Sequence, residues 1–257
     1  MTPLLHVREL VQDKSLLFAF VKQDLRLKYR GSLLGYLWAM LNPLMTLVVM
    51  TVAFTFIFSN RYPLHLFAAL LPWQFFHTSQ IGGCNSLISS ASITLNWKTP
   101  LLIFPVRNTL YSFCEYLFAL CGLSVIAYFI GFRLTPSVMI LPLSMLLLLL
   151  FSMSLSIIMS VLAVHFRDMQ HLVDVAMRAW MYISPVIIPA ESFPENHRWV
   201  LTMNPMYYFL ELFDAPIARA EWPASNVLLT ATVITLLTAS VSLAVFDRYE
   251  SKLVFRM

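Results

Sequence analysis

The stretch Lys22–Phe58, KQDLRLKYRGSLLGYLWAMLNPLMTLVVMTVAFTFIF, decides the fold class. Basic residues crowd its first part, and no charged residue occurs from Leu33 to Phe58. As a helix at about 1.5 Å per residue, this uncharged run would measure roughly 39 Å, which exceeds the ~30 Å hydrocarbon layer of a bilayer. Because basic flanks stay on the cytoplasmic side, the stretch predicts an integral membrane protein whose amino terminus is cytoplasmic.

The composition of the whole chain indicates the same class. The 257 residues are 59% hydrophobic and 12% charged, whereas soluble domains are ~45–50% apolar. The net charge of +4 is spread over several loops, so we expect no nucleic-acid partner. The three cysteines Cys84, Cys114 and Cys121 lie in apolar segments without metal-ligand spacing, and are interpreted as small core residues. The first residues lack an apolar signal-peptide core, so no cleaved signal peptide is expected.

Six apolar stretches predict six transmembrane helices in an all-α membrane protein. The predicted spans are Leu33–Phe58, Leu64–Ile88, Thr109–Ile130, Val138–Val164, Leu172–Ile188 and Val227–Phe246. The fifth is marginal in length. No soluble domain or repeat is visible, so residues 1–257 are expected to form a single transmembrane domain. It would have a cytoplasmic interface segment at 1–31, a membrane domain at 32–247 and a cytoplasmic tail at 248–257.

The distribution of basic residues tests this topology. The cations assigned to the cytoplasm are Arg8, Lys14, Lys22, Arg26, Lys28, Arg30, Lys98, Arg107, Arg167, Arg248, Lys252 and Arg256. Those assigned to the outer side are Arg61, Arg133, Arg198 and Arg219, and Arg178 falls within the fifth span. Counting these two lists gives 12 against 4, so both termini are predicted to be cytoplasmic.

The segment before the first span has the pattern of an amphipathic helix. Its apolar residues Leu10, Val11, Leu17, Phe18, Val21 and Leu25 share one helical face. A helix lying in the cytoplasmic headgroup layer is one interpretation, since its cations would meet anionic lipids. The other interpretation is a solvated arm that ends in basic residues, which only set the membrane topology.

Motifs for catalysis are missing from the sequence. There is no GxxxxGK[ST], HExxH or GxSxG motif, so we expect no catalytic residue, no metal site and no cofactor bound by this chain. Asp174 and Arg178 are spaced to pair along one helix, and structural pairing is favoured over gating. Glu115 lies near enough to the cytoplasmic interface to find a partner or water. Without unpaired midplane carboxylates, an ion-coupled carrier is disfavoured.

The outer connection after the fifth span is long and largely apolar. Its segment Trp199–Ile217 is divided by Asn204-Pro205 into two pieces, each too short to cross a membrane. Two short re-entrant helices before the last span would fit, if protein covers the broken backbone. One amphipathic helix on the outer surface is the alternative.

Three segments carry a family resemblance. They are RLKYRGSLLGYLWAMLNPL from Arg26, HFRDMQHLVDVAMRAWMYISPVIIP from His165 and HRWVLTMNPMYYFLELFDAPI from His197. In this order and spacing they resemble the type-2 ABC transporter permeases of polysaccharide export, most closely those of O-antigen exporters. Teichoic-acid and capsule export permeases are near neighbours. The resemblance extends from about Leu25 to Asp247.

This resemblance implies an inner-membrane permease that works as a homodimer with two copies of a separate ATP-binding subunit, which would hold ATP and magnesium. The substrate would be an undecaprenyl-pyrophosphate-linked glycan. The segment Asn96–Arg107 would couple to the ATPase, as an apolar knob that fills a groove; an ordinary interfacial loop is the alternative. The coupling candidates are Lys98, Leu101, Leu102, Phe104 and Arg107.

The resemblance also implies an outer gate in Trp199–Ile217. The gate candidates are Trp199, Met203, Tyr207 and Tyr208. The family pattern has a basic residue at the position of Asp214, so this chain departs from it here. Any electrostatic role of this position is therefore in doubt.

Two further groups of residues are candidates for contact with the glycan. The first could line the path, since sugar C–H faces slide over aromatic rings: Tyr36, Trp38, Asn42, Phe54, Trp180 and Tyr182. Packing against lipid and neighbouring helices is the alternative for these aromatics. The second comprises Arg26, Lys28 and Arg30, which could receive the carrier pyrophosphate or only set orientation.

The leading hypothesis is therefore the transmembrane subunit of an ATP-driven exporter of lipid-linked polysaccharide in the bacterial cytoplasmic membrane. Within the family, the alternatives are export of teichoic acid, capsule or a small lipophilic drug. From another class, the alternative is an integral-membrane lipid or glycan transferase, which the lack of clustered His, Asp and Glu disfavours.

Overall fold

A computed structural model describes residues 3–54, 62–96, 99–130, 135–166 and 168–253. These residues form helices joined by turns and contain no strand. The helices are α1 (Pro3–Gln12), α2 (Lys14–Tyr29), α3 (Leu37–Phe54), α4 (Tyr62–Ser89), α5 (Ala91–Asn96), α6 (Ile103–Ile130), η1 (Pro136–Ile140), α7 (Leu141–His165), α8 (Met169–Ile183), η2 (Ala190–Ser192), η3 (Glu195–His197), α9 (Arg198–Met203), α10 (Pro205–Asp214), η4 (Ala215–Arg219) and α11 (Ser225–Leu253). The predicted all-α class is confirmed for this part of the chain.

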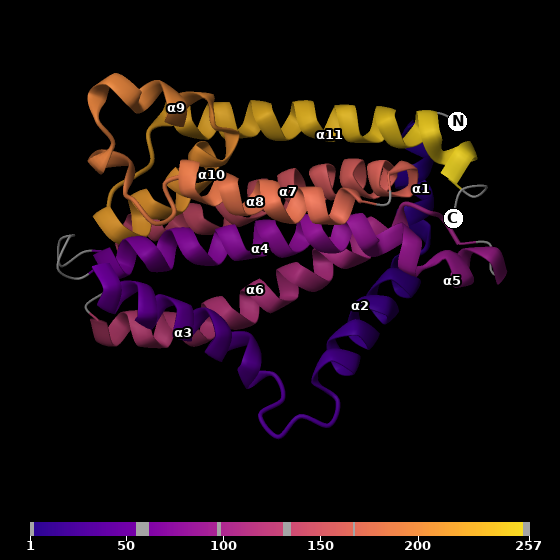
Figure 1. The fold of residues 1–257 in the computed structure, drawn as a ribbon, viewed down its shortest axis with the longest axis horizontal. Coiled ribbons are helices and arrows are strands. Elements are labelled where there is room, and N and C mark those ends of the chain that lie inside the picture. Colours follow the sequence, from indigo (N-terminus) through magenta and orange to yellow (C-terminus); the bar gives the residue numbers. More distant parts are fainter. Residues whose placement is uncertain (1–2, 55–61, 97–98, 131–134, 167, 254–257) are drawn as a thin grey trace.

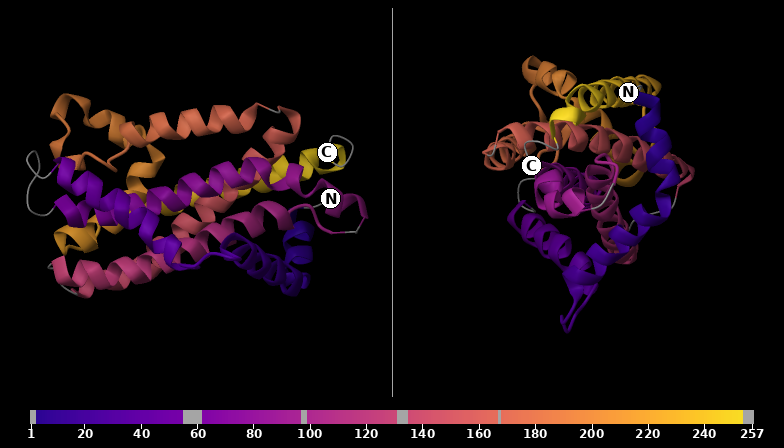
Figure 2. Two further views of the ribbon diagram at one scale, coloured as in Figure 1. Left: turned by 60° about the horizontal axis from the view of Figure 1, so that its bottom comes forward. Right: turned by 90° about the vertical axis from the view of Figure 1, so that its right-hand side faces the viewer.

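The long helices form a bundle along the longest axis of the molecule (Figure 1). The most extensive contacts join α4 to α7, α7 to α11 and α4 to α6. Both chain ends and α5 lie at one end of the bundle, whereas α9, α10 and the start of α11 lie at the other (Figures 1 and 2). We call these the inner end and the outer end, after the sides predicted for them from the sequence.

Each predicted span coincides with a helix, although the boundaries differ. Three helical stretches have the length and hydropathy to cross a membrane among the residues described: α3, Pro136–His165 and α11. The helices α4 and α6 have 28 residues each, about 42 Å at 1.5 Å per residue. The fifth predicted span differs most, because α8 ends at Ile183 instead of Ile188 and has only 15 residues.

The first span begins later than predicted, at Leu37 instead of Leu33. The residues before it form a turn in which Gly31 and Gly35 have φ values of +76° and +50°. Side chains with a Cβ avoid this left-handed region, so the two glycines allow the chain to reverse between α2 and α3. Once begun, α3 continues through Pro43 without ending. Its predicted last residues, 55–58, lie outside the described residues.

The centre of the bundle is the contact between α4 and α7. A Cβ added to Gly83 of α4 would collide with the hydroxyl of Ser156 in α7 and lie 3.0 Å from its carbonyl oxygen. Glycine and serine at this crossing let the two backbones approach closely. Phe76 of α4 stacks on Phe151 of α7 with ring centroids 5.5 Å apart, which fills the space beside the crossing.

The amino-terminal segment is two helices instead of one. The inward face of α2 buries Leu17 and Val21, and Leu17 packs with side chains around the start of α6, whereas Val11 and Phe18 are exposed. The predicted apolar face is therefore divided: part of it packs on the protein, and part faces outward.

At the outer end, the predicted Asn204-Pro205 break separates α9 from α10. Pro205 begins α10, where its missing N–H costs no hydrogen bond, and the Asn204 side chain accepts from the Met206 N–H at 3.0 Å. The apolar side chains of α10, including Met206, Phe209 and Phe213, are buried in the main core. A single helix on the surface is therefore wrong for this segment.

Candidate functional site: a polar cavity between α2, α3, α4 and α6

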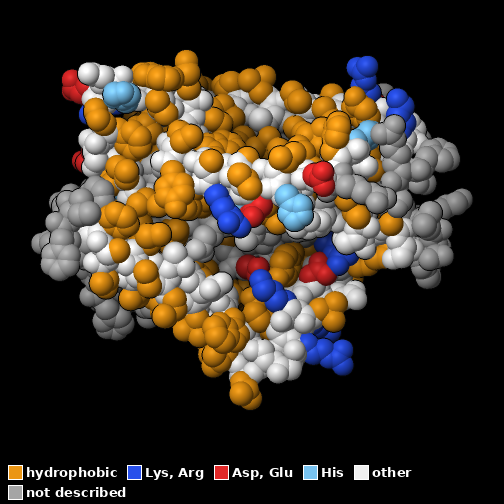
Figure 3. Space-filling view, in the orientation of Figure 1, with side chains coloured by type: hydrophobic (Ala, Val, Ile, Leu, Met, Phe, Trp, Pro, Cys, Tyr) orange, Lys and Arg blue, Asp and Glu red, His pale blue; other side chains and the backbone are white. Residues whose placement is uncertain are grey.

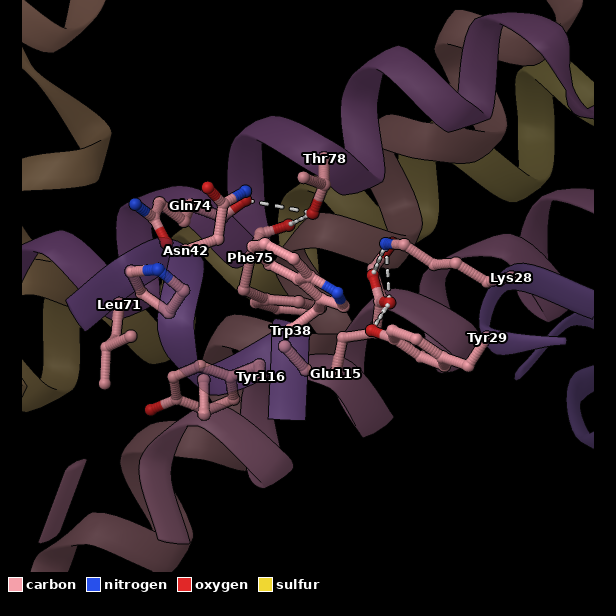
Figure 4. Close-up of a pocket in the computed structure, with 14 residues that line it drawn as sticks. Lys28, Tyr29, Trp38, Asn42, Leu71, Gln74, Phe75, Thr78, Glu115 and Tyr116 are labelled. Carbon is pink, nitrogen blue, oxygen red and sulfur yellow. Dashed lines mark hydrogen bonds and ion pairs between the residues drawn. The ribbon is translucent and has the colours of Figure 1, made fainter. Parts of the chain in front are cut away.

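A cavity of about 270 Å³ lies where α2, α3, α4 and α6 meet. Its lining mixes aromatic rings with polar groups: Lys28, Tyr29, Trp38, Ala39, Asn42, Pro43, Leu71, Gln74, Phe75, Thr78, Ser112, Glu115, Tyr116 and Ala119. Figure 4 shows Trp38 near the middle of this group, with the amides of Asn42 and Gln74 on one side and Lys28 with Glu115 on the other. Two of the predicted path residues, Trp38 and Asn42, therefore belong to one cavity.

Glu115 is the best-paired group of the cavity. The ammonium of Lys28 donates to its two oxygens at 2.6 and 2.9 Å. The hydroxyls of Tyr29 and Tyr111 donate to Oε1 at 2.8 and 3.0 Å. The expectation that Glu115 finds a partner is confirmed, since Lys28 neutralises its charge.

The phenol of Tyr29 is a neutral donor in this arrangement. Burial, and then the hydrogen bond to Glu115, raises the pKa of Tyr29. Its ring lies 4.7 Å from that of Tyr36, which in turn lies 5.5 Å from Phe118 of α6. Tyr36, a predicted path residue, thus helps to hold the turn between α2 and α3 against α6.

A second ion pair joins α2 to α6 beside the cavity. The guanidinium of Arg107 donates through Nε to Asp24 Oδ2 at 2.5 Å and through Nη2 to Oδ1. The same guanidinium lies 4.9 Å from the centre of the Phe20 ring. Asp24 and Lys28 are one turn apart on α2, so the two pairs fasten one face of α2 to α6. Figure 3 shows basic and acidic side chains gathered near the middle of one face of the molecule.

The structure separates the three predicted pyrophosphate candidates. Lys28 is engaged by Glu115, whereas Arg26 and Arg30 are exposed on another side of α2. These two arginines line a shallow groove with Lys22, four residues before Arg26. Lys22, Arg26 and Arg30 therefore form an exposed basic row at successive turns of α2.

The predicted coupling residues lie mainly inside the protein. Lys98 lies outside the described residues. Leu101, Leu102 and Phe104 are at most 4% exposed, because they pack with the end of α11 and the inward face of α2. Arg107 is paired with Asp24. In this structure the apolar side chains Leu101, Leu102 and Phe104 are therefore part of the core of the chain, and their coupling to an ATPase stays a prediction.

The remaining predicted path residues are spread over the molecule. Phe54 lies 5.9 Å from Tyr62 in ring-centroid distance, near the outer end of α3. Trp180 packs edge-to-face on Trp73 and Phe76 and donates its indole N–H to Asn204 Oδ1 at 2.8 Å. Tyr182 is exposed. The structure does not bring these three side chains to the cavity that contains Trp38.

The predicted gate residues lie at the outer end. Trp199 and Met203 of α9 are exposed, and the rings of Tyr207 and Tyr208 in α10 are 5.2 Å apart. Asn204 lies between α9 and α10, and its amide donates to the Ser184 hydroxyl at 2.8 Å. This hydrogen bond attaches the segment to the end of α8.

A network of charges at the outer end was not predicted. Asp214 is buried, and its two oxygens meet His65 Nδ1 at 2.6 Å and Arg219 Nη1 at 2.9 Å. Arg219 also donates to Glu211. Asp214 therefore takes part in electrostatic pairing. No sequence spacing relates His65 to Asp214, which are 149 residues apart.

The predicted Asp174–Arg178 pair is confirmed. Arg178 Nη2 donates to Asp174 Oδ2 at 2.5 Å, and His77 Nε2 lies 3.5 Å from Asp174 Oδ1. Arg178 itself is largely exposed, whereas Asp174 is partly buried.

These features define a class of protein: a membrane-embedded protein, helical throughout the described residues, with an open polar cavity between α2, α3, α4 and α6 in which Lys28 and Glu115 balance each other's charge. The family profile of the ABC-2 type transporter matches residues 15–217. The chain belongs to this family of transporter permeases. Membership implies an ATP-binding partner subunit and a transporter instead of an enzyme.

Individual relatives agree with this assignment. The chain is 27% identical to the O-antigen export system permease protein RfbA of Myxococcus xanthus over 246 residues, which cover 94% of this chain and 95% of that one. It is 29% identical to the protein of the same name from Klebsiella pneumoniae, with 91% and 92% covered. The polysialic acid transport protein KpsM of Escherichia coli is 21% identical, with 92% and 94% covered. The chain is thus a permease of the polysaccharide-export type.

Proposed function

We propose that this chain is the transmembrane subunit of an ATP-driven exporter that moves a lipid-linked polysaccharide of the O-antigen type across the bacterial cytoplasmic membrane. The observation that carries this proposal is the similarity to O-antigen export permeases over more than nine-tenths of the chain. ATP and magnesium would be held by the partner subunit. Both termini would be cytoplasmic, since the segments assigned to that side carry 12 basic residues against 4 in the segments assigned to the outer side.

Six membrane crossings suit the helices of the structure. The helices α3, α4, α6, α7 and α11 have at least 18 residues each. At about 22 Å, α8 is too short to cross alone. The chain after α8, which packs on the buried α10 through Asn204, would complete the fifth crossing within protein.

The lipid-linked substrate is supported by the exposed basic row of α2. A pyrophosphate at the inner leaflet would meet Arg26 and Arg30, whose guanidinium groups suit phosphate oxygens. Lys28, the third candidate, would instead hold α2 in place through Glu115.

A homodimer is supported by the uneven burial of the spans. The helix α3 exposes a run of large apolar side chains, among them Met45, Val49 and Val52, and α8 exposes Leu172, Val175 and Tyr182. The exposed ion pair Asp174–Arg178 on α8 is costly against hydrocarbon. A second copy or an aqueous path between two copies would give these charges a polar surrounding.

Export of a capsule-type polymer is the second candidate, because KpsM is also similar over most of the chain. One experiment distinguishes the candidates: deletion of the gene in its native host, with complementation by a plasmid copy. Loss of surface O-polysaccharide, with lipid-linked glycan retained inside, is the expected result. Loss of capsule alone would favour the second candidate, and unaltered surface glycans would contradict both.

The ATPase requirement is tested in the same strain. The partner gene is replaced by a variant whose phosphate-loop lysine is changed to alanine, and export is measured again. Export should stop although both subunits remain in the membrane. Continued export would contradict an ATP-driven mechanism.

A further inference from the structure

We propose that the cavity between α2, α3, α4 and α6 is a binding site for one ring of an uncharged sugar. The proposal rests on the proposed function of polysaccharide export and adds a place on the chain where the glycan is held. It is carried by the charge, the hydrogen-bonding groups and the aromatic surface that line the cavity.

The charge of the lining favours a neutral ligand. Among the described residues that line the cavity, Lys28 and Glu115 carry opposite charges and pair at 2.6 Å. A phosphate or an acidic sugar would have to approach the Glu115 carboxylate, while Lys28 is already engaged. Separating this pair to bind an anion would leave Glu115 with only the hydroxyls of Tyr29 and Tyr111.

The uncommitted polar groups match sugar hydroxyls. Within the described structure, the side-chain amides of Asn42 and Gln74 have no hydrogen-bond partner, and both line the cavity. Each amide offers donors and an acceptor, as a sugar hydroxyl does. A lipid tail in the cavity would cover these amides without satisfying them, which costs free energy.

The aromatic surface supplies the other half of sugar recognition. Trp38 is 51% exposed and lies between the amides and the ion pair (Figure 4). The face of its ring carries partial negative charge, and the C–H groups on one face of a pyranose are partially positive. A sugar ring placed over Trp38 could therefore stack with its C–H face while its hydroxyls reach Asn42 and Gln74.

The size of the cavity limits the ligand to about one ring. Its volume is about 270 Å³, just below the ~300–1,000 Å³ that is typical of small-molecule pockets. With few hydrogen bonds and one aromatic surface, the site would hold a glycan weakly enough for the chain to move on.

Saturation-transfer NMR tests the site on the complete permease–ATPase complex in lipid nanodiscs. The probes are the methyl glycosides of glucose, galactose, mannose and rhamnose. We expect transfer to the ring C–H protons of at least one probe. Asn42→Ala should weaken its binding about five-fold through one lost hydrogen bond, and Trp38→Leu should abolish the transfer. Trp222→Leu, which changes an exposed tryptophan away from the cavity, is the matched control and should leave the transfer unchanged.

The outcomes separate this proposal from the proposed function. If the complex exports glycan in cells but no probe shows transfer, or if transfer survives in both cavity variants, the sugar site is wrong and the export function stands. If native mass spectrometry shows a phospholipid bound to the wild type and lost in Asn42→Ala, while no probe shows transfer, the cavity is a lipid site. If deletion of the gene leaves surface glycans unaltered, the export function itself fails.

Discussion

The ion pairs in two regions of the bundle differ in how exposed they are. Around the cavity, Asp24–Arg107 and Lys28–Glu115 attach α2 to α6. At the outer end, Arg219 pairs with Asp214 and Glu211 inside a packed segment. The exposed fractions of the paired side chains are 21% and 12% for Arg219 and Asp214, 20% and 22% for Arg107 and Asp24, 49% and 17% for Lys28 and Glu115, and 71% and 32% for Arg178 and Asp174.

The exposed fraction of an ion pair indicates how much that pair stabilises the fold. A buried charge that loses its partner cannot turn to water, whereas an exposed charge can. The outer network should therefore hold the fold, and the exposed pair on α8 should contribute little to it. Four substitutions test the gradient from its strongest to its weakest member. For each variant, the change in stability is measured by thermal unfolding in lipid nanodiscs. Unfolding is monitored through the reaction of the Cys84 thiol, which is buried in the folded protein.

Arg219→Leu should have the largest effect. It leaves Asp214 and Glu211 near each other without their shared cation, which should destabilise the protein by about 3–5 kcal/mol. Arg198→Leu removes an exposed arginine of the same end and should change stability by less than about 0.5 kcal/mol. Equal effects of the two variants would contradict a structural role for the network.

Arg107→Gln should destabilise the protein by about 2 kcal/mol, because it removes the bidentate pair of hydrogen bonds to Asp24. A double-mutant cycle with Asp24→Asn isolates the pair, and we expect a coupling energy of at least about 1 kcal/mol. Strictly additive effects would show that the two side chains act independently.

Lys28→Gln should cost about 1 kcal/mol, since Glu115 keeps the hydroxyls of Tyr29 and Tyr111 as donors. The matched variant Arg26→Gln/Arg30→Gln removes exposed cations of the same helix. It should leave stability unchanged and reduce export, since it removes the proposed phosphate contacts. Normal export by this double variant would eliminate a substrate role for the basic row.

Arg178→Gln should have the smallest effect on unfolding, at most about 0.5 kcal/mol, because the pair with Asp174 is exposed and lies along one helix. A loss above about 2 kcal/mol would mean that Arg178 is buried in the working assembly. The measurement therefore also reports whether a second copy covers α8.

The helices of the bundle could be predicted from sequence because long apolar runs between polar turns leave few alternatives. The late start of α3 could not, since it depends on the backbone angles of Gly31 and Gly35 and not on hydropathy. The inward position of Leu101, Leu102 and Phe104 also escaped prediction, because an apolar segment between prolines looks the same whether its partner is another subunit or the same chain.

The cavity was only half predictable. Trp38 and Asn42 stand out in the first span, and Glu115 stands out as a carboxylate in an apolar run. Their meeting with Lys28 and Gln74 brings together α2, α3, α4 and α6, and nothing in one sequence specifies the distances between these helices. Lys28 and Glu115 are 87 residues apart.

The contact of Gly83 with Ser156 limits how this permease can move. Where two helix backbones touch without side chains between them, sliding or tilting one against the other meets immediate collisions. The pair α4–α7 should therefore travel as one rigid body during a transport cycle. The motion that opens a passage is then left to the borders with helices that contact this pair less extensively, such as α3 and α8.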